Sequence, residues 1–193
     1  MKKYICLIFL SITLCCYTEE VYIIKNENDK SHLEKINRIE YIKKNIIYNI
    51  DGTIYYTDNL SRIYKVIRKE SLILSNAKRN NYAQRKIVEL YGIKEQDHGG
   101  HIIGRQFGGS PNIDNIIPIN KNVNTGEMLK MEMEWKDILN NHGKAEDIII
   151  DINYIYTNMR PNIIKINYKV EQDYTNYRII KIFTNTIITN NYK

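Results

Sequence analysis

The stretch Asp97-His98-Gly99-Gly100-His101 opens a segment that runs to Trp135 and decides how the fold is interpreted. This segment contains two of the four histidines, the single tryptophan and, before its helix begins, five of the nine glycines. Two glycines before His101 let the backbone approach a ligand closely. Histidine is the usual general base for activating water, because its ordinary pKa lies near neutrality. We therefore expect His101 to carry chemistry, although an arbitrary histidine is more often a core or surface residue.

The residues at the start of this stretch have weaker cases. Asp97 could orient the imidazole of His101, as carboxylates commonly do, or it could simply cap a turn. His98 is expected to be an ordinary core or surface histidine. The residues themselves leave both alternatives for Asp97 open.

The strongest predicted helix runs from Asn124 to Asn141 and is ended by Gly143. At roughly 100° per residue, four apolar residues fall within about 40° of the direction of Asn124. They are Met128, Met131, Trp135 and Ile138. Asn124 therefore lies at the mouth of the face that packs on the strands, where its amide oxygen could bind a hard cation such as Mg²⁺. An alternative needs no metal, because Asn124 followed by Glu127 also fits a helix N-cap.

Composition limits the classes of protein and of site. The 193 residues are 43% hydrophobic and 26% charged, which suits one globular domain with additional segments. The net charge of +6 suits a polyanionic partner but is too small to identify one. All three cysteines, Cys6, Cys15 and Cys16, precede the body of the chain. A disulfide framework and a cysteine-ligated zinc site are therefore excluded there, and any metal must use oxygen or imidazole ligands.

The first 16 residues have the pattern of a signal peptide. Three residues with two lysines precede an apolar run from Tyr4 to Cys16 that is short for a membrane span. Cys15 and Cys16 also allow a lipoprotein-type signal, and a buried N-terminal strand is the structural alternative. We expect a secreted, periplasmic or lipid-anchored extracytoplasmic protein, with no stable membrane span after the leader is cleaved.

The rest of the chain predicts an α+β domain at residues 45–193, preceded by an N-terminal extension at residues 17–44. In the extension, Ser31 and Glu34 fit the start of a short helix, and His32 is expected at the surface. Asp51-Gly52 between two apolar runs predicts a hairpin of strands 46–50 and 53–56. Further strands are expected at 62–67, 72–74, 148–156, 163–170 and 178–188, with a helix at 80–90.

The order and spacing of these motifs resemble a known family. The motifs are Asp97 to Gly104, Phe107-Gly108-Gly109, Asn115 to Pro118, and Asn124-Thr125-Gly126 through Glu132 to Trp135. They are similar to DNA/RNA non-specific endonucleases with the ββα-metal (His-Me finger) fold, in the bacterial secreted or toxin-type branch. The resemblance covers about residues 45–141. It implies a ββα-metal core at about residues 96–141, inserted in a mostly antiparallel sheet.

The resemblance also implies catalytic and metal-binding roles. His101 would be the general base, and Asn124 the direct protein ligand of a hydrated Mg²⁺ or another divalent cation such as Mn²⁺. Glu132 would hold metal-bound water, and Arg79 would steady the scissile phosphate. Lys136 would be a second basic contact to substrate phosphate.

Two positioning residues complete the implied site. Asn115 would position the loop or the histidine, and Asp97 would position the imidazole. The common family motif is Asp-Arg-Gly-His, whereas this chain has three residues, His98, Gly99 and Gly100, between Asp97 and His101.

The activity implied by the resemblance is metal-assisted hydrolysis of phosphodiester bonds in DNA, RNA or both, with little sequence specificity. The expected partners are the nucleic-acid substrate and an immunity or inhibitor protein. One alternative is a catalytically inactive nucleic-acid-binding or interaction protein on the same fold. Another is a ribonuclease-type toxin domain that a specific partner neutralises.

Overall fold

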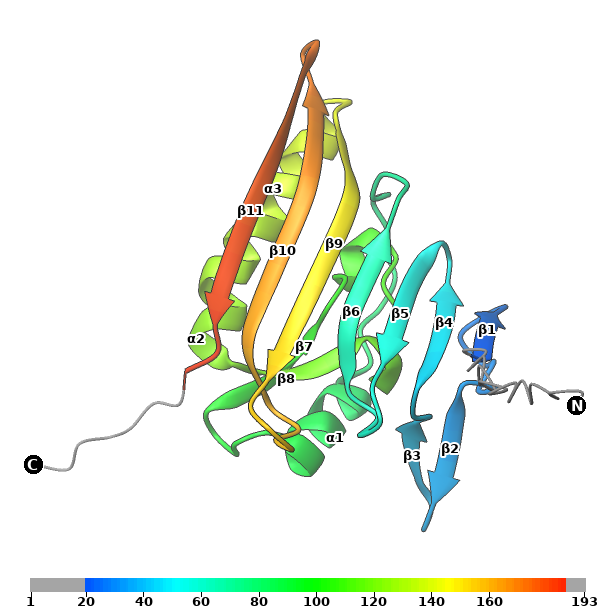
Figure 1. Cartoon of the computed structure of the whole chain (residues 1–193). Helices are drawn as coiled ribbons and strands as arrows, with labels where there is room; N and C mark the ends of the chain where they lie inside the picture. Colours follow the sequence, from blue (N-terminus) through cyan, green and yellow to red (C-terminus); the bar gives the residue numbers. More distant parts are fainter. Residues whose placement is uncertain (1–19, 187–193) are drawn as a thin grey trace, which may run out of the picture.

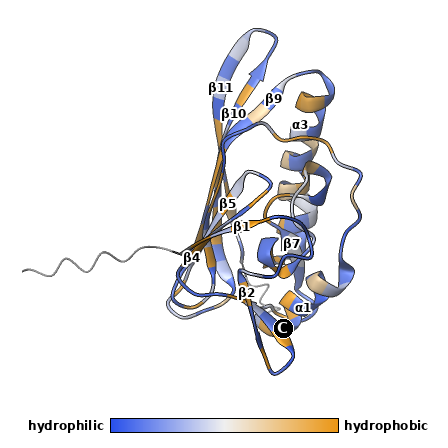
Figure 2. Ribbon diagram, turned by 90° about the vertical axis from the view of Figure 1, so that its right-hand side faces the viewer, coloured by the Kyte–Doolittle hydropathy of each residue, from blue (hydrophilic) through white to orange (hydrophobic). Residues whose placement is uncertain are grey.

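A seven-stranded sheet organises the computed structural model, which describes residues 20–186. Its strands, in spatial order, are β1 (Glu20–Ile24), β4 (Ile46–Ile50), β5 (Thr53–Thr57), β6 (Ile63–Arg68), β9 (Lys144–Tyr154), β10 (Pro161–Gln172) and β11 (Thr175–Thr184). Neighbouring strands are antiparallel except for the parallel pair β1–β4. The helices cover one face of this sheet and leave the other open (Figures 1 and 2). The predicted α+β class is confirmed.

The predicted hairpin is confirmed as β4 and β5. Asp51 and Gly52 have φ angles of 47° and 79°. Positive φ at both central residues is the geometry of a type I′ turn, whose twist matches that of the flanking strands. Alternating burial along β5 directs Tyr55 into the core beside Tyr48, and the two rings stack with centroids 4.9 Å apart.

Two predictions outside the central segment are wrong. Residues 72–74 form no strand. Of the three, only Leu72 is buried, and its amide donates a single hydrogen bond, to the carbonyl of Ala145, without a ladder of further bonds. The expected helix at Ser31 is instead a turn leading into β2 (Leu33–Ile36), which pairs with β3 (Ile39–Ile42). His32, expected at the surface, is fully buried.

A second, two-stranded sheet carries the DHGGH stretch. It consists of β7 (Asp97–His101) and antiparallel β8 (Ile116–Asn120), with His101 opposite Ile116. Helix α1 (Asn81–Tyr91) packs against β7 so closely that a Cβ on Gly99 would collide with the backbone of Gln84. The glycine is therefore needed for the approach of two backbones.

The long helix starts three residues earlier than predicted. It comprises α2 (Lys121–Val123), a π-helical turn (Asn124–Met128) and α3 (Leu129–Asn140). Asn120 is the N-cap, since its side chain accepts a hydrogen bond from the amide of Asn122. The N-cap alternative for Asn124 is therefore wrong, because this residue lies inside the helix with φ −63° and ψ −44°.

The helix packs on the large sheet through the predicted apolar stripe. All four residues of the stripe are buried, and the fully buried Trp135 contacts Phe107 and Tyr168 edge-on. This packing holds the helix on the large sheet, and because the helix follows β8 directly, β7, β8 and the helix form the ββα unit. Within residues 20–186, no helix is both long and apolar enough to cross a membrane. The predicted leader and the last two residues of the predicted strand at 178–188 lie outside the described residues.

Candidate active site

A polar pocket of about 200 Å³ lies where the end of β7, the following loop and the long helix meet. Most of its lining comes from the segment that begins at Asp97. The charged or polar groups on its wall include Arg79, His101, Arg105, Asn124 and Glu132. Four of these five were predicted as site residues, and the fold brings them together from positions 53 residues apart in the sequence, from Arg79 to Glu132 (132 − 79).

His101 is the histidine that lines the pocket. Its side chain is mostly buried, and Nε2 has no hydrogen-bond partner among the described residues. Burial, together with the positive charges of Arg79 and Arg105, lowers the pKa of His101 to about 4. The imidazole is therefore neutral at pH 7. A neutral, unpartnered imidazole facing a polar pocket can accept a proton.

This geometry predicts an unusually acidic titration of His101. In the metal-free protein, NMR should show its imidazole titrating near pH 4 rather than near the ordinary 6.5. Arg79→Gln should raise this pKa, because it removes a positive charge that disfavours the imidazolium ion. Lys35→Gln, a change on the exposed part of β2, should leave it unchanged. A wild-type value of 6 or above would contradict the burial of His101.

Asn124 faces β7 through its amide oxygen. A Cβ on Gly100 would lie 2.7 Å from Asn124 Oδ1 and 2.5 Å from the side chain of Ile119. Gly100 thus leaves the space that the amide oxygen occupies beside the histidine strand. The π-helical turn at Asn124 widens the helix at this position, and such turns are frequent at functional sites.

Glu132 lines the same pocket, eight residues after Asn124. A Cβ on Gly104 would collide with Glu132 Oε1, so this second glycine makes room for the carboxylate. Gln106 donates a hydrogen bond of 3.1 Å to Glu132 Oε2. Burial raises the pKa of Glu132, whereas the charge of Arg79 and the bond from Gln106 oppose that change.

The donor set of the pocket fits a hard, hydrated cation. Amide and carboxylate oxygens are ligands that Mg²⁺ prefers, and Mg²⁺ keeps several waters when few protein ligands are available. Two glycines leave room around the oxygens of Asn124 and Glu132. Among residues 20–186, no three His, Cys, Asp or Glu side chains converge to hold a metal. A cation in the pocket would therefore depend on an amide oxygen and its own water.

Asn115 is fully buried and holds the loop after His101 on both sides. Its side chain accepts from the amide of Ile103 at 3.0 Å and donates to the carbonyls of Ile103 and Ser110, both at 2.9 Å. Its backbone carbonyl accepts from the amide of Ile102 at 2.8 Å. The geometry matches the loop-positioning alternative stated for this residue.

Asp97 does not contact the imidazole of His101, and its bond from the amide of Ile93 agrees with the turn-capping alternative. Its carboxylate receives two hydrogen bonds from Arg160, of 2.7 and 2.8 Å, and a third from the amide of Ile93. The carboxylate therefore pins β7 to the start of β10 and does not pair with the imidazole. Any influence on His101 passes through the strand that the two residues share.

The buried pair predicts a large stability effect. Arg160→Met would leave the fully buried Asp97 carboxylate without its charged partner, and such changes cost about 3–5 kcal/mol. Lys69→Gln, which breaks an exposed pair with Asp147, should cost less than about 1 kcal/mol. Urea unfolding of both variants measures the difference. Equal losses for the two variants would contradict the structural role of the Asp97–Arg160 pair.

Lys136 was predicted to contact substrate phosphate but lies outside the pocket, whereas Arg105 was not predicted and lines it. Lys136 is exposed on α3 and is not part of the pocket wall. Arg105 was missed, although it is a basic residue in the glycine-rich loop directly after His101. It lines the pocket and donates to the carbonyls of Lys78 and Gly109, which fixes its guanidinium. Gln84 was not predicted as a site residue, yet it also lines the pocket and donates to the carbonyl of Gly99.

Comparison with known proteins agrees with this geometry. The family model of DNA/RNA non-specific endonucleases matches residues 44–172. Type VII secretion system protein EssD of Staphylococcus aureus, from strains USA300 and NCTC 8325 / PS 47, is 34% identical over 149 residues, or 74% of this chain. The chain spans 24% of the length of these relatives. Nucleases of this family depend on metal ions, which implies a divalent cation. Because the family model covers well over half of the chain, including every residue of the pocket wall, the protein belongs to the DNA/RNA non-specific endonuclease family.

Proposed function

We propose that the protein is an exported endonuclease that hydrolyses DNA and RNA with little sequence specificity, using His101 as general base and a Mg²⁺ ion held by Asn124. The observation that carries this proposal is the neutral, unpartnered His101 in one pocket with Asn124 Oδ1 and Glu132. The pocket thus combines a base, oxygen ligands for a hard cation and basic residues for a phosphate.

The residues divide the reaction between them. His101 takes a proton from the attacking water, which the lowered pKa permits across the neutral range. Arg79 and Arg105 stabilise negative charge on the phosphate as attack proceeds. Glu132 accepts hydrogen bonds from water near Asn124 and so orients it. A bound divalent cation would supply Lewis-acid stabilisation of the charge on phosphate and leaving oxygen.

A second hollow lies beside the catalytic pocket. It shares Arg79, Gln84, Asn124 and Thr125 with the catalytic pocket and extends along α1. Arg85 and His98 are added to its wall there. Asp97 and Glu89 also border it, but Arg160 compensates the charge of Asp97 and Lys86 pairs with Glu89. We propose that a neighbouring phosphate of the same strand binds beside Arg85 and His98. Contacts to phosphates carry no sequence information, which is consistent with low specificity.

This strand path predicts a binding defect rather than a chemical defect. Arg85→Gln should raise KM for a long oligonucleotide, leave kcat close to wild type, and reduce the salt dependence of binding by about one phosphate contact. Lys35→Gln, on the exposed part of β2, is the charge-matched control and should change neither. A fall in kcat with unchanged KM would contradict the assignment of Arg85 to the strand path.

The proposed activity is tested on end-labelled DNA and RNA of mixed sequence. Cleavage at many internal positions of both, in Mg²⁺ and not in chelator, is expected. Binding of DNA in chelator without cleavage in Mg²⁺ would favour the inactive, binding-only alternative.

Export and a protective partner belong to the same proposal. EssD is named as a type VII secretion system protein, and a non-specific nuclease retained in the cytoplasm would attack its producer's nucleic acids. We therefore propose that an immunity or inhibitor protein accompanies the nuclease. Cytoplasmic expression of residues 17–193 should be toxic, and His101→Ala should remove the toxicity. Equal growth with and without the wild-type protein would contradict this.

A further inference from the structure

The segment at residues 20–43 lies before the family match at 44–172, yet its side chains reach the loop of the active site. We propose that this segment, the N-terminal brace, holds the loop at residues 102–115 in its catalytic position, with His32 and Glu27 as positioning residues. The proposal rests on the proposed function for its catalytic consequence. Its structural part, the hold on the loop, stands on contacts of the described residues alone.

His32 makes the first contact of the brace. It is fully buried, and its Nε2 lies 2.9 Å from Oδ2 of Asp114, a residue 82 positions later. The His32 ring stacks on Tyr48 with centroids 4.8 Å apart. Tyr48 donates a hydrogen bond of 2.6 Å to the carbonyl of Asp114. Asp114 is therefore fixed at both its side chain and its backbone.

The position of Asp114 matters because Asn115 follows it. Asn115 holds the amide of Ile102 with its backbone and both polar groups of Ile103 with its side chain. Ile102 is the residue after His101. A shift of Asp114 would therefore move Asn115, the next residue, and with it the hydrogen bond to Ile102 beside His101.

Glu27 makes the second contact, at the other side of the loop. Its carboxylate pairs with the guanidinium of Arg105, and its carbonyl accepts from Asn112 Nδ2 at 3.1 Å. Arg105 lines the catalytic pocket, and the next residue, Gln106, donates to Glu132. Glu27 therefore supports the part of the loop that positions the carboxylate of the site.

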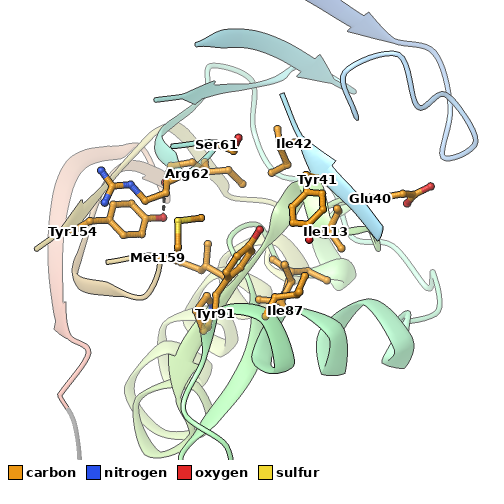
Figure 3. Close-up of a pocket in the computed structure, with 15 residues that line it drawn as sticks. Glu40, Tyr41, Ile42, Ser61, Arg62, Ile87, Tyr91, Ile113, Tyr154 and Met159 are labelled. Atoms are coloured by element: carbon orange, nitrogen blue, oxygen red, sulfur yellow. Dashed lines mark hydrogen bonds between the residues drawn. The ribbon is translucent and has the colours of Figure 1, made fainter. Parts of the chain in front are cut away.

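The hairpin of β2 and β3 packs on α1 through apolar side chains. Tyr41 and Ile42 of β3 lie across a small pocket from Ile87 and Tyr91 of α1, with Ile113 beside them (Figure 3). This pocket shares no lining residue with the catalytic pocket. The hairpin is thus anchored away from the chemistry, while His32 and Glu27 extend to the loop.

The test uses full-chain variants that break one contact each. Glu27→Gln removes the charge of a mostly exposed side chain, so folding should be preserved. His32→Phe keeps an aromatic ring on Tyr48 but loses the bond to Asp114, and His32→Gln restores a donor near the position of Nε2. Lys30→Gln, in the turn before β2, breaks an exposed pair with Glu40 of β3 and is the control.

We expect Glu27→Gln and His32→Phe to lower kcat by about 10-fold or more with little change in KM, in the range measured for residues that orient catalytic groups. His32→Gln should recover part of the loss, and Lys30→Gln should behave as wild type. Hydrogen exchange of the amides of Ile102 and Ile103 should accelerate in the two defective variants.

Wild-type kcat in both folded variants would overturn the brace, and so would an increase in KM alone. Wild-type cleavage measured beside them shows whether the proposed function itself holds. If the wild type did not cleave, hydrogen exchange would still test whether the brace holds the loop. Faster exchange of Ile102 and Ile103 in the variants would support the hold on the loop, and unchanged protection would overturn it.

Discussion

His101→Ala is expected to lower kcat for phosphodiester cleavage by about 10²- to 10⁴-fold, the usual contribution of a general base. The reason is that His101 lines the pocket with Asn124 and Glu132, is neutral at pH 7, and has no hydrogen-bond partner for Nε2 among the described residues. KM should change little, because Arg79 and Arg105 remain to bind phosphate. Initial rates on plasmid DNA over a range of concentrations measure both constants.

The control for this substitution is another histidine. His142 is exposed and follows the long helix, and it lines neither the catalytic pocket nor the second hollow. His142→Ala should retain wild-type kcat. Added imidazole should restore part of the activity of His101→Ala, since a free base can enter the space left by the side chain. A His101→Ala protein with unchanged kcat and an intact fold would remove His101 from catalysis.

Asn124→Ala should lower activity at ordinary Mg²⁺ concentrations by at least about 10²-fold, because it removes an amide oxygen from the pocket wall. The remaining activity should need a higher Mg²⁺ concentration. Asn124→Asp keeps an oxygen at this position and should retain more activity than the alanine variant. Titrating Mg²⁺ in the cleavage assay, and by calorimetry without substrate, measures the effect.

Gly100→Ala is a second variant that disturbs the position of Asn124. Its new Cβ would lie 2.7 Å from Asn124 Oδ1 and must displace the amide without removing it. Weaker Mg²⁺ binding is therefore expected from this variant too. Mg²⁺ binding at wild-type strength in Asn124→Ala would contradict the assignment of this residue as the metal ligand.

Elements with local signals were predictable from sequence. The Asp51-Gly52 hairpin follows from turn chemistry between two apolar runs, and the structure has positive φ at both residues. The apolar stripe from Met128 to Ile138 follows from helical periodicity and is buried as expected. Such signals lie within one element and need no tertiary partner.

The errors arose where tertiary contacts decide. His32 is buried because Asp114 and Tyr48 receive it, and no local pattern reveals a partner 82 residues away. Asp97 pairs with Arg160, 63 residues later, instead of with the nearby imidazole. The early start of the long helix depends on the side-chain cap by Asn120, which lies at the end of a buried strand.

The site shows the same division. The family resemblance supplied the roles of His101, Asn124 and Glu132, whereas residue physics alone left His101 as one histidine among four. The structure adds a physical distinction, since burial and two arginines lower the pKa of His101. It also explains the additional glycine of the DHGGH stretch. Gly99 admits the backbone of α1, and Gly100 admits the amide oxygen of Asn124.

The most direct test of a single-histidine, metal-dependent nuclease compares wild-type protein and His101→Ala on covalently closed plasmid DNA, each in Mg²⁺ and in chelator. Conversion to nicked, linear and then fragmented DNA is expected only for the wild type in Mg²⁺, with both proteins equally folded. Equal cleavage by the two proteins in Mg²⁺ would remove His101 from catalysis, and undiminished wild-type cleavage in chelator would exclude a metal-dependent reaction.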